Sequence, residues 1–171
     1  TNLEKMGFNN VYYLPNFKNL RVLNSDECTY CTEPPYKICT FSRVMKEKGI
    51  EDAVKAVKAV NSTLNKQMFK LDIYGKIDDG QTEWFRNVQR EFDESIEYKG
   101  LVDGSASTEI IKNYFLLLFP TYYSGEGYPG TLLDAFSAGV PVIASDWAYN
   151  SEIVNNKLGF LFPAKNASAL I

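Results

Sequence analysis

Two basic side chains lie five residues apart in the segment from Thr40 to Gly49, where Arg43 is followed by Lys48. The apolar run before this segment predicts a strand, and the residues after it predict a helix. Loops at the carboxyl ends of parallel strands are where such sheets bind ligands. A guanidinium and an ammonium that converge there, beside the N–H groups of a helix start, would hold a diphosphate. Because exposed charges are common, a solvated basic loop is the alternative interpretation.

A second group of residues, from Ser124 to Gly139, combines a glycine-rich loop with two carboxylates. The glycines that let the backbone approach an anion closely are Gly125, Gly127 and Gly130. Glu126 lies in this loop, and Asp134 follows eight residues later, about one turn into a helix expected from Thr131. A carboxylate at Asp134 can accept two hydrogen bonds from neighbouring hydroxyls, as a ribose presents them. The alternatives are a favourable charge near a helix start for Glu126 and a solvent-facing helix residue for Asp134.

Short apolar stretches alternate with amphipathic ones along the chain, which is typical of a parallel sheet wrapped by helices. We therefore expect an α/β fold, a Rossmann-like parallel sheet with helices on both faces. The expected strands are Val11–Leu14 (ended by Pro15 and Asn16), Tyr36–Phe41, Phe69–Tyr74, Ser95–Lys99, Phe115–Phe119, Val140–Ser145 and Gly159–Phe162. The first expected helix begins after Gly49, and the second contains the apolar positions from Trp84 to Phe92. Further helices are expected over Ser107–Tyr114, Thr131–Ala138 and Ser151–Val154, and a last one begins within Lys165–Ile171.

Composition excludes several classes of function. The chain has 171 residues, 45% of them apolar, which fits one domain and argues against disorder. Its 18 basic and 21 acidic residues argue against a general nucleic-acid binder, and no apolar run approaches the ~20 residues that span a bilayer. The chain has no histidine, so it cannot by itself supply Ser-His, Cys-His or His-metal chemistry. Three cysteines neither close a disulfide framework nor complete a four-ligand zinc site, so we expect free thiols.

Taken in order, these motifs resemble the C-terminal, nucleotide-sugar-binding domain of GT-B-fold retaining glycosyltransferases, the large family 4 (group 1) type. The resemblance covers essentially the whole chain. Its most specific part joins Glu126-Gly-Tyr-Pro129 and Asp134 to the runs Ala138–Ile143 and Glu152–Val154. The other matching segments are Val11–Asn16, Phe41–Gly49, with Ser42 where the family usually has Gly, Leu71–Gly75 and Tyr98–Gly100. Glu126 and Asp134 match the two acids of the family's Glu-x7-Glu motif, with Asp in the second place.

The resemblance implies roles for these residues. Arg43 and Lys48 would bind the donor diphosphate and stabilise the charge on the leaving nucleotide, and Glu126 would bind hydroxyls of the donor sugar. Asp134 would hold the ribose, and it is one methylene shorter than the Glu that the family usually has at this position. The remaining substrate-binding positions are Gly100, Leu101 and Val102 beside the base, and Gly127, Tyr128, Gly130, Thr131 and Leu132 around the phosphate-binding helix start. Nearby aromatics, Tyr122, Tyr123, Tyr128, Trp147 and Tyr149, are candidates for stacking on a sugar.

The resemblance further implies a function, the transfer of a hexose from a UDP- or GDP-sugar to a polysaccharide or other glycoconjugate, with no metal or other cofactor. We expect residues 1–171 to be the donor-binding domain, excised from a two-domain enzyme whose N-terminal domain binds a glycan or lipid-linked acceptor. We also expect a cytoplasmic enzyme without a nucleic-acid partner, with peripheral association at the inner face of the membrane as a further option. Two alternatives stay open: a non-catalytic nucleotide-binding module and a sugar-nucleotide epimerase of similar fold, whose acid-base residues the sequence does not reveal.

Overall fold

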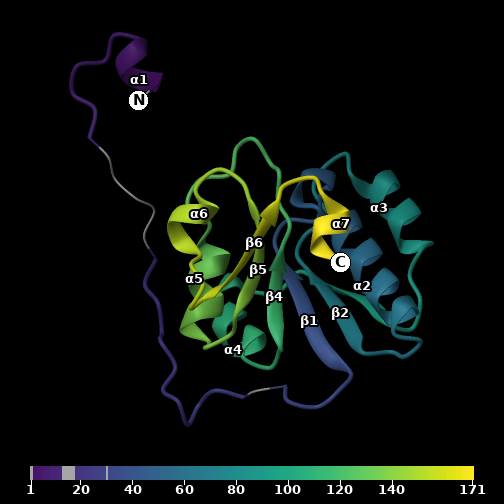
Figure 1. Cartoon of the computed structure of the whole chain (residues 1–171). Helices are drawn as coiled ribbons and strands as arrows, with labels where there is room; N and C mark the ends of the chain where they lie inside the picture. The colour runs from purple at the N-terminus through teal and green to yellow at the C-terminus, as the bar shows by residue number, and fades with distance from the viewer. Residues whose placement is uncertain (1, 13–17, 30) are drawn as a thin grey trace.

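The computed structural model describes residues 2–12, 18–29 and 31–171. In this part of the chain, six parallel strands form one sheet in the order β3-β2-β1-β4-β5-β6 (Figure 1). The strands are β1 (Tyr36–Phe41), β2 (Phe69–Tyr74), β3 (Ile96–Gly100), β4 (Leu116–Phe119), β5 (Val142–Asp146) and β6 (Gly159–Pro163). Of the strand predicted over Val11–Leu14, Val11 and Tyr12 are not in a strand, and residues 13–17 lie outside the described part.

Helices connect the strands in turn. The α-helices are α1 (Asn2–Lys5), α2 (Ile50–Thr63), α3 (Thr82–Gln89), α4 (Ser107–Ile111), α5 (Gly130–Ser137), α6 (Asn150–Ile153) and α7 (Ala167–Leu170), and the 3-10 helices are η1 (Lys46–Lys48) and η2 (Gly104–Ala106). In Figure 1, α1 stands apart from the sheet and its helices. Among the residues described, no helix combines the length and the apolar character that crossing a membrane requires.

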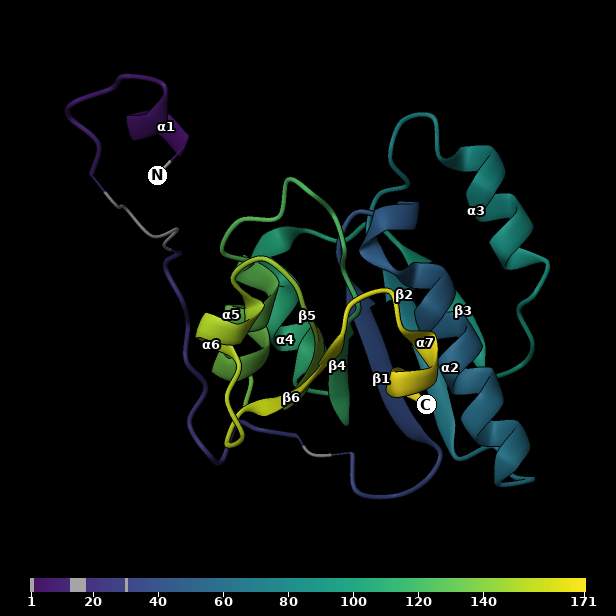
Figure 2. The same ribbon diagram turned by 45° about the horizontal axis from the view of Figure 1, so that its top comes forward.

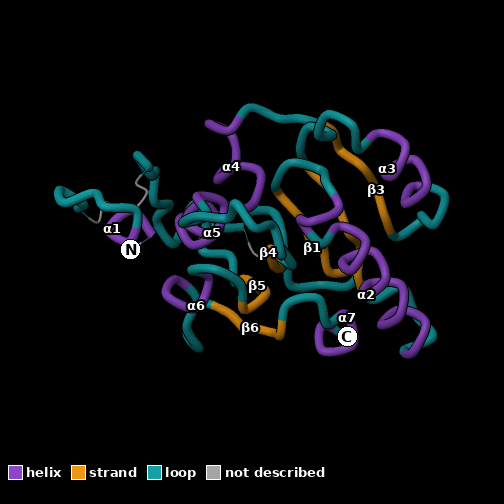
Figure 3. The backbone as a smooth tube through the Cα atoms, turned by 90° about the horizontal axis from the view of Figure 1, so that it is seen from above, coloured by secondary structure: helices purple, strands orange, loops and turns teal. Residues whose placement is uncertain are grey.

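The sheet separates two hydrophobic cores, which confirms the expected layers. Alternate residues of β4 show the division, since Leu116 and Leu118 pack into one core and Leu117 and Phe119 into the other. The first core includes residues of α2, α3 and α7, and the second includes residues of α4, α5 and α6. Figures 2 and 3 show these two groups of helices on opposite sides of the sheet. Because both faces are covered, β4 is apolar and buried throughout.

Apart from the strand predicted over Val11–Leu14, the predicted elements are found in the structure, with shifts at their ends. The strand expected from Val140 begins at Val142, because the backbone N–H of Val140 bonds to Ala135 O and caps α5 instead of entering the sheet. The helix expected to begin at about Gly49 is preceded by the single 3-10 turn η1, which places Lys48 on a fixed turn. Gly49 then adopts φ +70°, and a Cβ at this position would stand 2.2 Å from Pro120 O. The connection from β1 to α2 therefore packs directly on the end of β4.

β1 and β4 are neighbours in the middle of the sheet, although two strands separate them in the sequence. The strand order is that of a doubly wound sheet, whose order reverses between these two strands. The connections that leave their carboxyl ends turn to opposite faces of the sheet, α2 to one and α5 to the other. Ligands bind outside the carboxyl ends of strands at such a reversal point. The loops after β1 and β4 are therefore the first place to look for a site.

Candidate functional site

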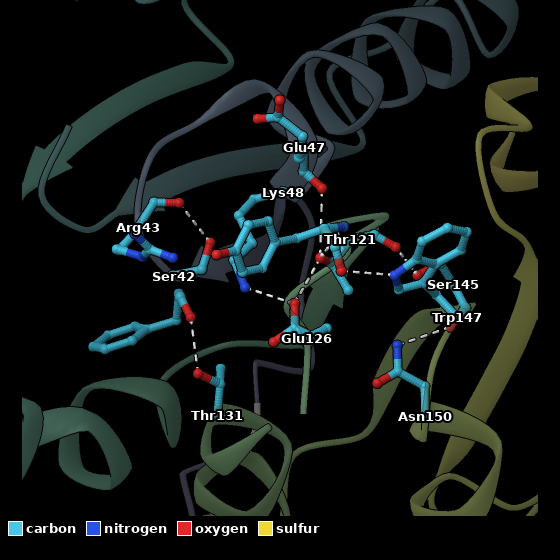
Figure 4. Close-up of polar contacts among 12 residues, drawn as sticks. Ser42, Arg43, Glu47, Lys48, Thr121, Glu126, Thr131, Ser145, Trp147 and Asn150 are labelled. Atoms are coloured by element: carbon cyan, nitrogen blue, oxygen red, sulfur yellow. Dashed lines mark hydrogen bonds and ion pairs between the residues drawn. The ribbon is translucent and has the colours of Figure 1, made fainter. Parts of the chain in front are cut away.

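An ion pair joins the two loops that follow β1 and β4. Nζ of Lys48, the last residue of η1, lies 2.6 Å from Oε2 of Glu126, and each side chain is only 9% exposed. The hydroxyl of Thr121 donates to the same carboxylate oxygen at 2.7 Å. Figure 4 shows Lys48 and Thr121 converging on Glu126. The structure thus brings together a cation and an acid that are 78 residues apart in the sequence.

Arg43 lies beside the same pair. The ring centre of Tyr123 is 5.4 Å from Cζ of Arg43 and 5.1 Å from Nζ of Lys48, so one aromatic ring contacts both cations. The guanidinium also bonds to Asp78 at 2.9 Å, and its side chain remains half exposed. The side chain of Tyr123, and then that of Asp78, raises the pKa of Arg43. Arg43, Lys48 and Glu126 therefore lie at one edge of the sheet, with Arg43 the most accessible of the three.

The segment that carries Glu126 is held by contacts that the sequence did not reveal. The indole N–H of Trp147 donates to Tyr123 O at 2.8 Å, and the N–H of Tyr122 donates to Glu47 O at 2.8 Å. The hydroxyl of Ser145, at the end of β5, donates to Thr121 O (Figure 4). Sequence reasoning placed Trp147 among candidate sugar-stacking residues, whereas its indole nitrogen anchors the loop. Its position two residues after the predicted strand Val140–Ser145 is the signal that could have suggested this contact.

The start of α5 lies against the end of β1. The hydroxyl of Thr131 donates to Phe41 O at 3.0 Å, which fixes the first turn of the helix two residues before Arg43. Leu132 is fully buried in the core on the α5 side of the sheet, so only its backbone is near the loop. Gly127 is exposed and Tyr128 is half buried against the same core. These positions, together with Gly130 at the helix start, present mainly backbone to the site.

Asp134 is buried, so the alternative that it is a solvent-facing helix residue is wrong. Its residue surface is 4% exposed. Both of its carboxylate oxygens lie 2.7 Å from Nζ of Lys18, and Ser107 Oγ lies 2.7 Å from Oδ2. Lys18 comes from a segment 116 residues earlier in the chain, and no sequence pattern marked it. The carboxylate expected to hold a ribose is therefore already engaged by an ammonium and a hydroxyl.

The residues expected beside the base follow β3. Gly100 ends this strand, and its carbonyl accepts a hydrogen bond of 2.8 Å from the N–H of Gly75. Leu101 is exposed and Val102 is half buried. This loop leads through η2 into α4, whose first residue Ser107 contacts Asp134. The loop and the Asp134 carboxylate are thus joined at the same edge of the sheet.

Taken together, this edge of the sheet offers cations, the loop that carries the Glu126 carboxylate, and the start of a helix. Such a set suits a ligand that carries both phosphate and hydroxyl groups. Preorganised cations and N–H dipoles of this kind stabilise a departing phosphate. Within the described ranges, no group of three or more Cys, Asp or Glu side chains is placed to hold a metal ion.

Three comparisons place the chain among known proteins. Residues 35–171 match the family model described as Glycosyl transferases group 1. The chain is 32% identical over 156 residues to the UDP-N-acetylglucosamine–peptide N-acetylglucosaminyltransferase GtfA subunit of Streptococcus gordonii, covering 89% of this chain. It is 31% identical to the pneumococcal O-GlcNAc transferase GtfA, solved in complex with UDP and GlcNAc, with a TM-score of 0.60 and 77% of this chain covered. A variant of Staphylococcus aureus TarM, solved with fondaparinux, α-GlcNAc-glycerol and UDP, shares the fold, with a TM-score of 0.72 over 97% of this chain and 20% identity.

The chain spans only part of these relatives, 29% of the S. gordonii subunit, 25% of the pneumococcal protein and 32% of TarM. The family match, by contrast, extends from just before β1 to the last residue and includes both loops of the site. The family match favours neither of the two alternatives, a sugar-nucleotide epimerase and a non-catalytic nucleotide-binding module. The chain therefore belongs to the group 1 glycosyl transferases.

Proposed function

We propose that this chain is the donor-binding domain of a two-domain glycosyltransferase and that it binds a UDP-sugar. The observation that carries the proposal is the placement of Arg43 and Lys48 around the ring of Tyr123, beside Glu126. Two cations in the connection that follows β1, beside the loop that follows β4, match the two negative groups of a diphosphate. The start of α5 adds backbone dipoles on the same side.

In this proposal the chain stabilises the leaving group. The bond between the sugar C1 and the phosphate oxygen breaks, and its electron pair stays on the nucleoside diphosphate. Arg43 and Lys48 neutralise that charge, which is the largest contribution that a site of this kind makes. Glu126 accepts hydrogen bonds from hydroxyls of the sugar. An acceptor hydroxyl bonds to C1, and its proton passes to the departing diphosphate oxygen.

We propose UDP-N-acetylglucosamine as the donor and a polypeptide as the acceptor. Support comes from the curated relative at 32% identity, which is named as a UDP-N-acetylglucosamine–peptide transferase. The pneumococcal relative was solved with UDP and GlcNAc. The expectation from sequence was broader, a hexose from a UDP- or GDP-sugar and a polysaccharide or other glycoconjugate acceptor. Assays of the whole protein with UDP-GlcNAc, UDP-glucose and a GDP-sugar separate these donors.

The proposal extends to three further properties. The reaction retains the configuration at C1, as in family 4 enzymes, and the anomeric proton of the product checks this by NMR. It needs no metal, so an excess of EDTA leaves turnover unchanged. It takes place in the cytoplasm, with the acceptor bound by a separate N-terminal domain, and at the inner face of the membrane when the acceptor is lipid-linked.

The central experiment is calorimetric titration of this chain with UDP, GDP and pyrophosphate. We expect saturable binding of UDP that is tighter than binding of GDP. Arg43→Ala should weaken both UDP and pyrophosphate by about tenfold or more, because one charged hydrogen bond contributes ~1.5–3 kcal/mol. Arg43 suits this test because its side chain is half exposed, so its removal leaves the core intact.

The matched control is Arg86→Ala, which removes an exposed arginine on α3. This variant should bind UDP as the original chain does. Binding of none of the three ligands, or equal binding by the Arg43 and Arg86 variants, would contradict the proposed site.

A further inference from the structure

A segment before β1, residues 18–29, runs along α4 and α5, and we call it the strap. Its contacts with these helices are specific. The N–H of Leu23 donates to Ser137 O at 2.9 Å, Leu23 is buried, and Arg21 bonds to Glu109 at 2.6 Å. Lys18 lies at the beginning of the strap and reaches Asp134. The strap precedes residue 35, where the family match begins, so that match assigns it no role.

The ammonium of Lys18, and not the carboxylate of Asp134, is the group that a ligand can reach here. The Lys18 side chain is 37% exposed and that of Asp134 is 6% exposed. Both carboxylate oxygens accept from Lys18, and Ser107 occupies a further lone pair of Oδ2. Two of the three ammonium protons satisfy the two 2.7 Å contacts, which leaves one proton for another acceptor.

Lys18 also lies at the start of α5. Its Cδ is 3.9 Å from the place where a Cβ at Gly130 would stand. The next residue, Thr131, bonds to Phe41 O, two residues before Arg43. The aliphatic part of Lys18 therefore passes over the first residue of the helix whose other side faces the end of β1. A cation held at this place favours an anionic oxygen.

We propose that Lys18 is a third phosphate-binding residue of the donor site and that Asp134 is its positioning residue. This inference rests on the proposed function, because it assumes a diphosphate between β1 and α5. It changes the role of Asp134: the carboxylate orients the ammonium instead of holding the ribose. One methylene less than Glu leaves Asp134 deep between α4 and α5, and Lys18 spans the remaining distance to the surface.

The test is titration of Lys18→Met with pyrophosphate and with UDP. Both ligands should bind about tenfold more weakly, because each loses one charge-assisted hydrogen bond. The ratio of the two dissociation constants should stay unchanged, since the lost contact is to phosphate. Lys18→Arg should restore most of the affinity. Lys55→Met is the matched control, because Lys55 is an exposed lysine that is also paired with a carboxylate, Glu51.

Lys18→Met leaves the Asp134 carboxylate buried without its cation, which could disturb folding. A second variant therefore separates a folding effect from a loss of ligand contact. Lys18→Met combined with Asp134→Asn replaces the pair by neutral groups of similar size and should show the same loss for both ligands. Asp134→Asn alone should weaken both ligands, though less than Lys18→Met does, because the ammonium remains but loses the carboxylate that orients it.

Two results would overturn the inference. Unchanged pyrophosphate binding by Lys18→Met would mean that Lys18 does not contact phosphate. Tighter UDP binding with unchanged pyrophosphate binding would mean that Lys18 competes with the ribose for Asp134. In either case the loss caused by Arg43→Ala would persist, whereas failure of the proposed function would remove binding of the original chain as well.

Discussion

Lys48 and Glu126 bond to each other at 2.6 Å across the reversal point of the sheet. The pair links the turn before α2 to the loop before α5, and both side chains are largely buried. Neither of the roles expected from sequence, one for phosphate and one for sugar hydroxyls, implied that the two side chains bond to each other. A ligand that uses both must therefore lengthen or share this bond.

Removing one member of the pair should destabilise the chain. Among the described residues, Lys48→Met leaves the Thr121 hydroxyl as the one side-chain donor to the Glu126 carboxylate, and loss of one partner of a buried pair costs ~3–5 kcal/mol. Lys48→Met with Glu126→Gln should recover most of that stability, since no buried charge remains. Urea unfolding measures both. Lys55→Met, which breaks an exposed i,i+4 pair, should cost no more than about 0.5 kcal/mol. Equal stability of the single and double variants would argue against the pair.

Gly49→Ala should be among the most damaging glycine substitutions in the site. The left-handed conformation costs about 1–2 kcal/mol for a residue with a Cβ, and the added atom would meet Pro120 O at 2.2 Å. We expect a lower unfolding midpoint and weaker UDP binding, because the turn that carries Lys48 must shift. Gly104→Ala is the control: its φ is not positive and nothing lies within 4 Å of the added atom. A variant at Gly49 as stable as the control would disprove the close packing on β4.

Trp147→Phe should loosen the loop that carries Glu126. The substitution keeps an aromatic ring but removes the N–H that bonds to Tyr123 O, which is worth ~1 kcal/mol. We expect a small loss of stability together with faster amide hydrogen exchange in residues 121–126. Tyr149→Phe, at an exposed residue of the same connection, should change neither property. If exchange in the loop stays the same in Trp147→Phe, another contact holds it.

The three cysteines should differ sharply in reactivity. Burial, and then the charge of Asp72, raises the pKa of the Cys39 thiol well above its usual range. Because the thiolate is the reactive form, Cys39 should resist a thiol reagent at pH 8 and still resist it at pH 9. Cys28 and Cys31, which are partly exposed, should react. Counting modified thiols by mass spectrometry should give two in the folded chain and three in urea. Rapid labelling of Cys39 in the folded chain would contradict its burial.

The fold followed from the sequence because its determinants are local. The apolar run over residues 115–119 predicts a buried strand, and apolar positions from Ile50 to Val57 recur at helical spacing. Both patterns survive in the structure as β4 and α2. Ends of elements were predicted less well, since they depend on capping contacts such as the bond from Val140 to Ala135.

The residue types at this edge of the sheet could be named from the sequence, but their pairings could not. The spacing from Glu126 to Asp134 was visible, yet the sequence could not show which cation each acid meets. Lys18 stands 116 residues from Asp134, and its segment has no periodicity that would have marked it. The Trp147 contact was missed because it depends on the way that two loops fold toward each other.

The three cations proposed to contact phosphate are each already paired with a carboxylate of the chain itself. Each partner comes from another stretch of sequence, and the pairs are Lys18 with Asp134, Arg43 with Asp78, and Lys48 with Glu126. Matched charges cancel at a distance, and the remaining field is screened within ~10 Å at 0.1 M salt. An anionic ligand would therefore arrive by unassisted diffusion, at a rate that hardly responds to ionic strength. The affinity would then be set by the residence time of the ligand. That time depends on how readily each cation exchanges the ligand's phosphate for its own carboxylate partner.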